Sequence, residues 1–136
     1  MEQRKLKSFL YEKIAERAVG FGVFPEMEGS IVPSTPAAVR LRIGFRNFQA
    51  GPAADTEGYF TGDISLEILS VPGNLSLTGM LTDSFLKLFS PGNGELRNED
   101  FRVLTTVATF SDHGSEGKYE RSGLKIHAVV WENHEH

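Results

Sequence analysis

The sequence predicts an α+β domain, with one mainly antiparallel sheet and two helices packed on one face of that sheet. Two segments repeat apolar residues at helical spacing, and four others alternate in polarity or are rich in β-branched and aromatic residues. Their order along the chain is α-β-β-α-β-β. With 136 residues, 40% of them hydrophobic, and no internal repeat, residues 1–136 are expected to form a single domain.

Each predicted helix carries one apolar stripe. The first is expected over about residues 2–18, ended by Gly20 and Gly22. The second is expected over residues 77–89, ended by "SPGNG". The apolar positions of the two stripes are Leu6, Phe9, Leu10 and Ile14, then Leu77, Leu81, Phe85, Leu88 and Phe89.

The four predicted strands fall into two hairpins. "AVRLRIGF" (38–45) and "YFTGDISLEIL" (59–69) alternate in polarity, as half-buried strands do. Antiparallel pairing of these two would set the outer arginines opposite outer acids. "FRVLTTVATF" (101–110) and "YERSGLKIHAVVW" (119–131) form the closing pair, joined by the turn-rich "SDHGSEGK".

Two connections are unusual. "RNFQAGPAADTEG" (46–58) spends thirteen residues on a hairpin turn that normally needs two to five. The segment 20–36 is rich in proline and glycine and yet apolar, so we expect it to pack irregularly over the core of this chain or of a neighbour.

Composition excludes several functional classes. The chain has no cysteine, so it holds no disulfide, thiolate metal site or thiol nucleophile. Fourteen basic and eighteen acidic residues give a net charge of −4, which disfavours binding to nucleic acid. The apolar runs are too short to span a membrane, and the charged N-terminus is unlike a signal peptide, so a cytoplasmic protein is expected.

Clusters of ionisable residues were weighed as candidate sites. His127, His134 and His136 lie in the last ten residues, but their spacing does not fit a helical zinc motif, and a frayed polar tail explains them better. The pair Asp63 and Glu67, four residues apart on one strand, would be about 13 Å apart, too far for an inverting glycosidase.

No phosphate-binding loop, dinucleotide fingerprint or nucleophile elbow occurs in the sequence. Asp112-His113 is interpreted as part of a turn. The sequence therefore predicts no catalytic, cofactor-binding or metal-binding residue, and no enzyme.

Protein–protein contacts remain as the candidate function. Val129 and Trp131 share the outer face of the last strand, which indicates that a partner, or else loop segments of the same chain, covers that face. The candidate contacts to a partner or to a second copy are Arg46, Phe48, Asp55, Glu57, Tyr59, Asp112, His113 and Trp131.

The chain as a whole resembles the tail terminator, or tail-completion, proteins of long-tailed phages and prophages. The likeness lies in the N-terminal helix, the early hairpin with a long loop, the mid-chain helix "LTDSFLKLF" and the closing hairpin "EDFRVLTTVATF…YERSGLKIHAVVWE". The resemblance implies a non-enzymatic virion protein without a cofactor, assembled in the bacterial cytoplasm. It implies a ring, usually a hexamer, that caps the tail-tube protein, stops its polymerisation and joins the head–tail connector.

A second class remains open. Secretion chaperones of the type III kind are likewise small, acidic, cysteine-free α+β proteins, and they act as dimers. Their usual layout adds a third strand before the mid-chain helix and a helix at the C-terminus.

Overall fold

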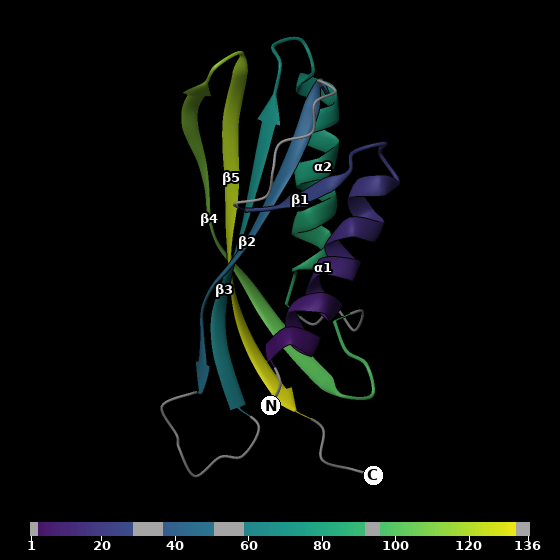
Figure 1. Ribbon diagram of the computed structural model, residues 1–136, viewed down its shortest axis with the longest axis vertical. Coiled ribbons are helices and arrows are strands. Elements are labelled where there is room, and N and C mark those ends of the chain that lie inside the picture. Colours follow the sequence, from purple (N-terminus) through teal and green to yellow (C-terminus); the bar gives the residue numbers. More distant parts are fainter. Residues whose placement is uncertain (1–2, 29–36, 51–58, 92–95, 133–136) are drawn as a thin grey trace.

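The computed structural model describes residues 3–28, 37–50, 59–91 and 96–132. Among them, five strands form one twisted sheet in the order β1-β2-β3-β5-β4, and both helices lie on the same face of it (Figure 1). The elements are α1 (Gln3–Val19), β1 (Pro25–Met27), β2 (Val39–Ala50), β3 (Tyr59–Ser70), α2 (Leu75–Leu88), β4 (Phe101–Glu116) and β5 (Tyr119–Glu132).

Both helices form where the apolar stripes predict them. The predicted stripe of α1 is buried, and so are Leu81, Phe85 and Leu88 of α2. At the end of α1 the chain reverses: the Gly22 N–H donates to Val19 O at 2.9 Å, and the Val23 N–H donates to Ala18 O at 3.0 Å. These bonds satisfy the last carbonyls of the helix and direct the chain back toward the sheet.

The two predicted hairpins are confirmed as antiparallel pairs, β2 with β3 and β4 with β5. Strand β5 lies between β3 and β4, pairing antiparallel with both. The expected meeting of outer arginines and acids also occurs, with Arg42 opposite Glu67 and Arg46 opposite Asp63.

One strand was missed, so the order α-β-β-α-β-β is incomplete. Pro25–Met27, inside the segment expected to be irregular, forms β1 and pairs parallel with Leu41–Ile43 of β2. The reversal after α1 sets this short segment along the edge of β2, and the Tyr11 hydroxyl donates to Pro25 O at 3.2 Å. A three-residue strand is too short to show a polarity pattern. Residues 29–36 of the same segment lie outside the described residues.

The first long connection is shorter than expected. Strand β2 continues to Ala50, through a bulge where the register with β3 shifts between Arg46 and Gln49. Asn47 adopts a left-handed conformation there (φ 59°), which asparagine tolerates better than most residues. Residues 51–58, with Asp55 and Glu57, lie outside the described residues.

The connection "SDHGSEGK", predicted to be rich in turns, is mostly strand. Strand β4 runs to Glu116, which pairs with Tyr119, so the hairpin turns through Gly117-Lys118 alone. Gly117 has φ 58°, a conformation that two-residue hairpin turns require and glycine supplies. Asp112 and His113 are therefore strand residues beside a bulge, where the Gly114 N–H donates to Asp112 Oδ1 at 3.0 Å.

The core lies between the helices and the sheet. As predicted, Leu81, Phe85 and Leu88 join one buried cluster with Leu41, Ile64, Leu66 and Ile126. The Thr105 hydroxyl, a polar group inside this layer, donates to Phe89 O at 2.8 Å, so its burial leaves no hydrogen bond unmade.

Candidate interaction surfaces

The sheet face opposite the helices carries charged side chains that form ion pairs within the chain. Arg42 donates to Glu67 at 2.9 Å and to Glu116 at 3.0 Å, joining β2, β3 and β4. Arg121 extends the group, 3.7 Å from Glu67. The hydrogen bond to Glu116 raises the pKa of Arg42 above its ordinary value. The same Arg42 guanidinium lowers the pKa of Glu116 below the ordinary value of a glutamate. The arginines of β2 are therefore neutralised by acids on neighbouring strands, as the predicted antiparallel pairing indicates.

Asp63 and His127 form a second pair on this face, with Asp63 Oδ1 3.2 Å from His127 Nδ1. Partial burial alone would raise the pKa of Asp63, but hydrogen bonds from His127 and Asn47 outweigh it and lower that pKa. A carboxyl group with a lowered pKa in the folded protein stabilises the fold above its unfolded pKa. That contribution is lost as the pH falls through the folded pKa.

We therefore expect Asp63→Asn to lower the free energy of unfolding at neutral pH by about 0.2–1 kcal/mol, the range of partly exposed pairs. The difference from the wild type should close as the pH falls below about 3.8, the ordinary value for this carboxyl. Urea unfolding across the acid range measures both. Asp83→Asn, an equal change of charge on the exposed side of α2, serves as the control for the effect of charge alone at neutral pH. A difference for Asp63→Asn that persists at pH 2–3 would contradict the assignment.

Trp131 is half-buried on the charged face, near the end of β5. The guanidinium of Arg102, on β4, lies 5.1 Å from its ring centre in a cation–π contact. Leu104 pairs with Val129 next to it and is 45% exposed. Arg102 of the same chain thus covers part of the outer face of β5. Binding of a partner to this face stays a prediction.

The other candidate contacts do not gather at one place. Arg46 is exposed and pairs with Glu28, and Asp112 is exposed on β4. Tyr59 begins β3, opposite Trp131, and His113 lies in the β4 bulge; their side chains are outside the described structure. A contact of any of these residues with a partner remains a prediction.

Phe48, also predicted to contact a partner, packs on its own chain. The β2 bulge turns its ring over Gly62 of β3, and the ring meets Phe45 edge to face with centres 6.2 Å apart. The Gln3 side-chain amide donates to Phe48 O at 2.9 Å, tying the start of α1 to this end of β2. The bulge explains the placement, because it exchanges the inward and outward sides of the strand.

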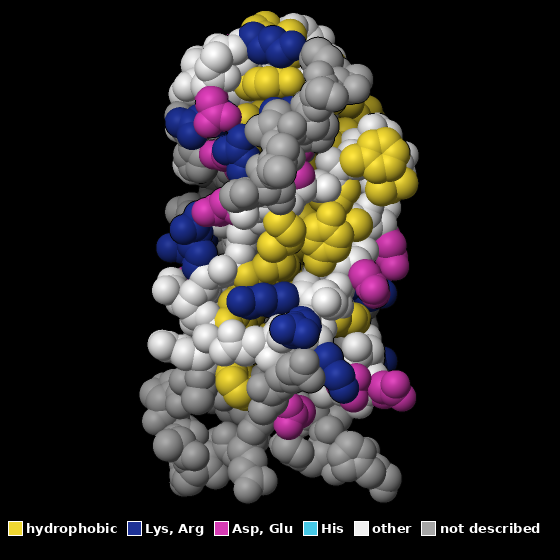
Figure 2. Space-filling view, in the orientation of Figure 1, with side chains coloured by type: hydrophobic (Ala, Val, Ile, Leu, Met, Phe, Trp, Pro, Cys, Tyr) yellow, Lys and Arg dark blue, Asp and Glu magenta, His cyan; other side chains and the backbone are white. Residues whose placement is uncertain are grey.

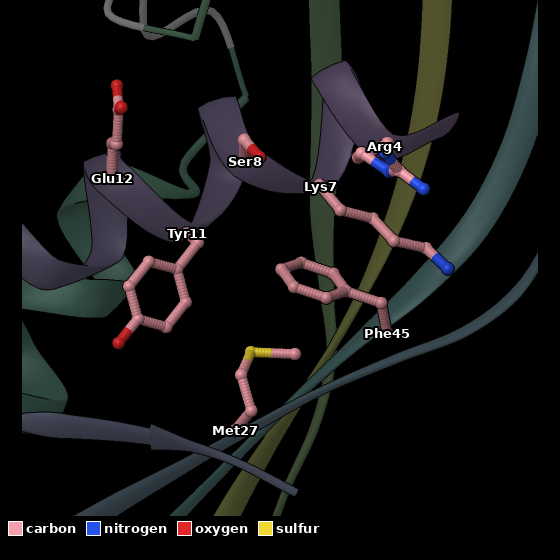
Figure 3. A pocket seen from close by; sticks show the side chains of 7 residues that line it. All are labelled: Arg4, Lys7, Ser8, Tyr11, Glu12, Met27 and Phe45. Atoms are coloured by element: carbon pink, nitrogen blue, oxygen red, sulfur yellow. The ribbon is translucent and has the colours of Figure 1, made fainter. Parts of the chain in front are cut away.

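Sequence reasoning missed a groove between α1 and the β1–β2 edge (Figures 2 and 3). Its volume is about 690 Å³. Tyr11, Met27 and Phe45 point toward one another and form its apolar floor, while Arg4 and Lys7 extend beside Phe45 (Figure 3). In Figure 2 the hydrophobic side chains of this region form a patch bordered by basic ones. The groove needed β1 to be recognised, because Met27 closes one side of it.

The described residues show no grouping of three or more His, Cys, Asp or Glu side chains that could hold a metal ion. His127 is exposed, whereas His134 and His136 lie outside the described residues. Neither described helix has the length and apolar character needed to cross a bilayer.

Comparison with known proteins finds similarity of structure alone. No family model matches the chain, and no curated protein matches its sequence. A chain in the virion of a native gene transfer agent particle superposes with a TM-score of 0.61 at 15% identity, covering 90% of this chain and 91% of that one. The likeness is one of fold. A second solved structure, whose name states no function, gives a TM-score of 0.63 at 16% identity over 99% of both chains.

Proposed function

We propose that this chain is a phage-type tail terminator, a non-enzymatic virion protein that caps the tail tube in a ring and provides the surface that joins the head. The observation that carries the proposal is the fold shared, over nine-tenths of both chains, with a component of a gene transfer agent virion. The resemblance of the sequence to tail terminators, in the order of its predicted elements, also supports it.

The two edges of the sheet support the proposal that subunits associate with one another. Within the described residues, β4 forms one edge of the sheet, and β1 with the last part of β2 forms the other. Two different edges on one subunit suit a head-to-tail contact, which closes into a ring when repeated around an axis. A secretion chaperone shares the third strand before α2, but the described residues after α2 form β4 and β5 and no further helix.

The test is removal of the gene from a bacterium that produces the particle. Without a terminator, tube polymerisation should continue, so electron microscopy should show tails longer and more variable than normal and unjoined to heads. The wild-type gene in trans should restore a single tail length. Tails of normal length and normal head joining in the deletion strain would contradict the proposal.

A second arm tests the expected role of the long connection. Replacing residues 51–59 by Asn-Gly should leave a folded protein, because Ala50 and Phe60 already pair across the hairpin. Failure of this variant to cap tails would indicate that the replaced residues contact the neighbour or the tube. Normal tail length with the variant would defeat that idea.

A further inference from the structure

Within the part of the chain that the structure describes, the edge of β2 has backbone hydrogen-bonding groups without a partner beside the groove. The last backbone bond from the β1 side is the Glu28 N–H to Ile43 O, at 2.8 Å. Backbone groups two residues apart in a strand point the same way, so the N–H and C=O of Phe45 also face this edge. Among the described residues, no backbone group pairs with Phe45 on that side. The edge of a sheet in this state is a template for one more strand.

The groove supplies side-chain contacts for such a strand. Its floor of Tyr11, Met27 and Phe45 is apolar, and Met27 is 39% exposed. Arg4 and Lys7 border it from α1, and neither forms an ion pair with a described residue. Glu12 also lines the groove but lies at its far end, with its side chain directed away from the hollow (Figure 3). The groove therefore presents positive charge next to an apolar floor.

We infer that this groove binds an extended segment of another protein, which adds to β2 as an edge strand. The segment is expected to place large apolar side chains on the groove floor and carboxylates beside Arg4 and Lys7. Backbone pairing supplies binding that does not depend on sequence, and the alternate side chains supply the specificity. The inference does not depend on the proposed ring or on its role at the tail.

Charge argues for another protein over a second copy of this chain. The other edge belongs to β4, where residues 96–98 of the same chain already pair with residues 101–103. The described exposed residues near the start of β4 are Arg102, Leu104 and Thr106, none of them acidic. The two carboxylates farther along β4 are already engaged, Asp112 by the Gly114 N–H and Glu116 by Arg42. That edge does not complement a basic groove.

The probe is a blocked, fluorescently labelled peptide, Ser-Glu-Thr-Phe-Thr-Leu-Thr-Glu-Ser, whose glutamates and apolar residues share one face when extended. We expect saturable binding by fluorescence anisotropy. A matched peptide with lysine in place of both glutamates should bind at least about tenfold more weakly. Methylating one alternate set of peptide amides should abolish binding, because those amides face β2, and methylating the other set should leave it intact.

The protein variants separate the groove from general charge. Arg4→Glu with Lys7→Glu should weaken binding at least about tenfold, whereas Lys118→Glu with Lys125→Glu, an equal charge change away from the groove, should leave it unchanged. Circular dichroism checks that both fold. Absence of binding up to about 1 mM peptide, equal binding of the lysine peptide, or no difference between the methylated sets would each overturn the inference. Self-association of the wild type that the Arg4/Lys7 variant abolishes would assign the groove to a second copy, and would overturn it too.

Discussion

Replacing Phe85 by alanine should lower the free energy of unfolding by about 3–5 kcal/mol, the usual cost of deleting a buried aromatic ring. Phe85 lies in the last turn of α2, has no exposed surface and belongs to the cluster that joins both helices to the sheet. Its removal would leave a cavity that the surrounding strands cannot fill, because they are held in register by their own hydrogen bonds. Urea unfolding followed by circular dichroism measures the change.

Leu86→Ala is the matched control, since Leu86 is the next residue of the same helix and is 38% exposed. It should cost less than about 1 kcal/mol, as most substitutions outside the core do. A loss under about 1 kcal/mol for Phe85→Ala would mean that this face of α2 does not hold the core.

Gly62→Ala should lower the free energy of unfolding by about 1–3 kcal/mol, as overpacking of a filled site does. A β-carbon at this position would lie 2.5 Å from ring atoms of Phe48, so the ring would have to leave its place over β3. The displaced ring would also lose its contact with Phe45. Gly79→Ala, on α2 with open space around it, is the control and should stabilise by about 0.5–1 kcal/mol.

A double-mutant cycle isolates the cause. Once Phe48 is alanine, the added methyl group at position 62 has no ring to meet, so Phe48→Ala with Gly62→Ala should be nearly as stable as Phe48→Ala alone. The coupling energy between the two positions is then expected to exceed about 1 kcal/mol. Additive losses would show that Gly62 is needed for a reason other than the ring above it.

The elements with many repeats of a pattern were predictable from the sequence. The two apolar stripes located α1 and α2 within two residues at each end, and the alternation of 38–45 and 59–69 gave the first hairpin and its inner face. These patterns work because burial on one side of a helix or strand leaves a period in the sequence. Periodicity alone also predicts that Phe85 lies in the core, where the structure places it.

Sequence-based predictions failed where a short strand, a bulge or a tight turn interrupts the periodic pattern of polarity. β1 is too short for a pattern, and the bulge at Asn47 breaks the alternation of β2, which concealed both the extra strand length and the inward position of Phe48. In "SDHGSEGK", residues typical of turns lie in a strand, because a bulge and a two-residue turn use Gly114 and Gly117 for φ values near 80° and 58°.

The groove between α1 and the β1–β2 edge could not be predicted from the sequence, because these missed features form part of it. The groove joins Arg4, Tyr11, Met27 and Phe45, which come from three elements, and one of them was not predicted at all. A signal was present in the sequence: Arg4 and Lys7 repeat at a spacing of three on α1. Such a repeat is also typical of any solvent-exposed helix face. Only the position of β1 shows that these two residues border a groove.

The position of β5 has a consequence for synthesis of the protein. Strand β5 follows every other strand in the chain, yet it lies between β3 and β4 and pairs with both along most of their length. While the chain is being translated, β2 and β3 can form their hairpin early, but one long edge of β3 stays unpaired until β5 has left the ribosome. An unpaired edge of that length invites pairing with other nascent chains. The tight turn after Glu116 shortens this interval, since β5 can align on β4 as soon as it emerges.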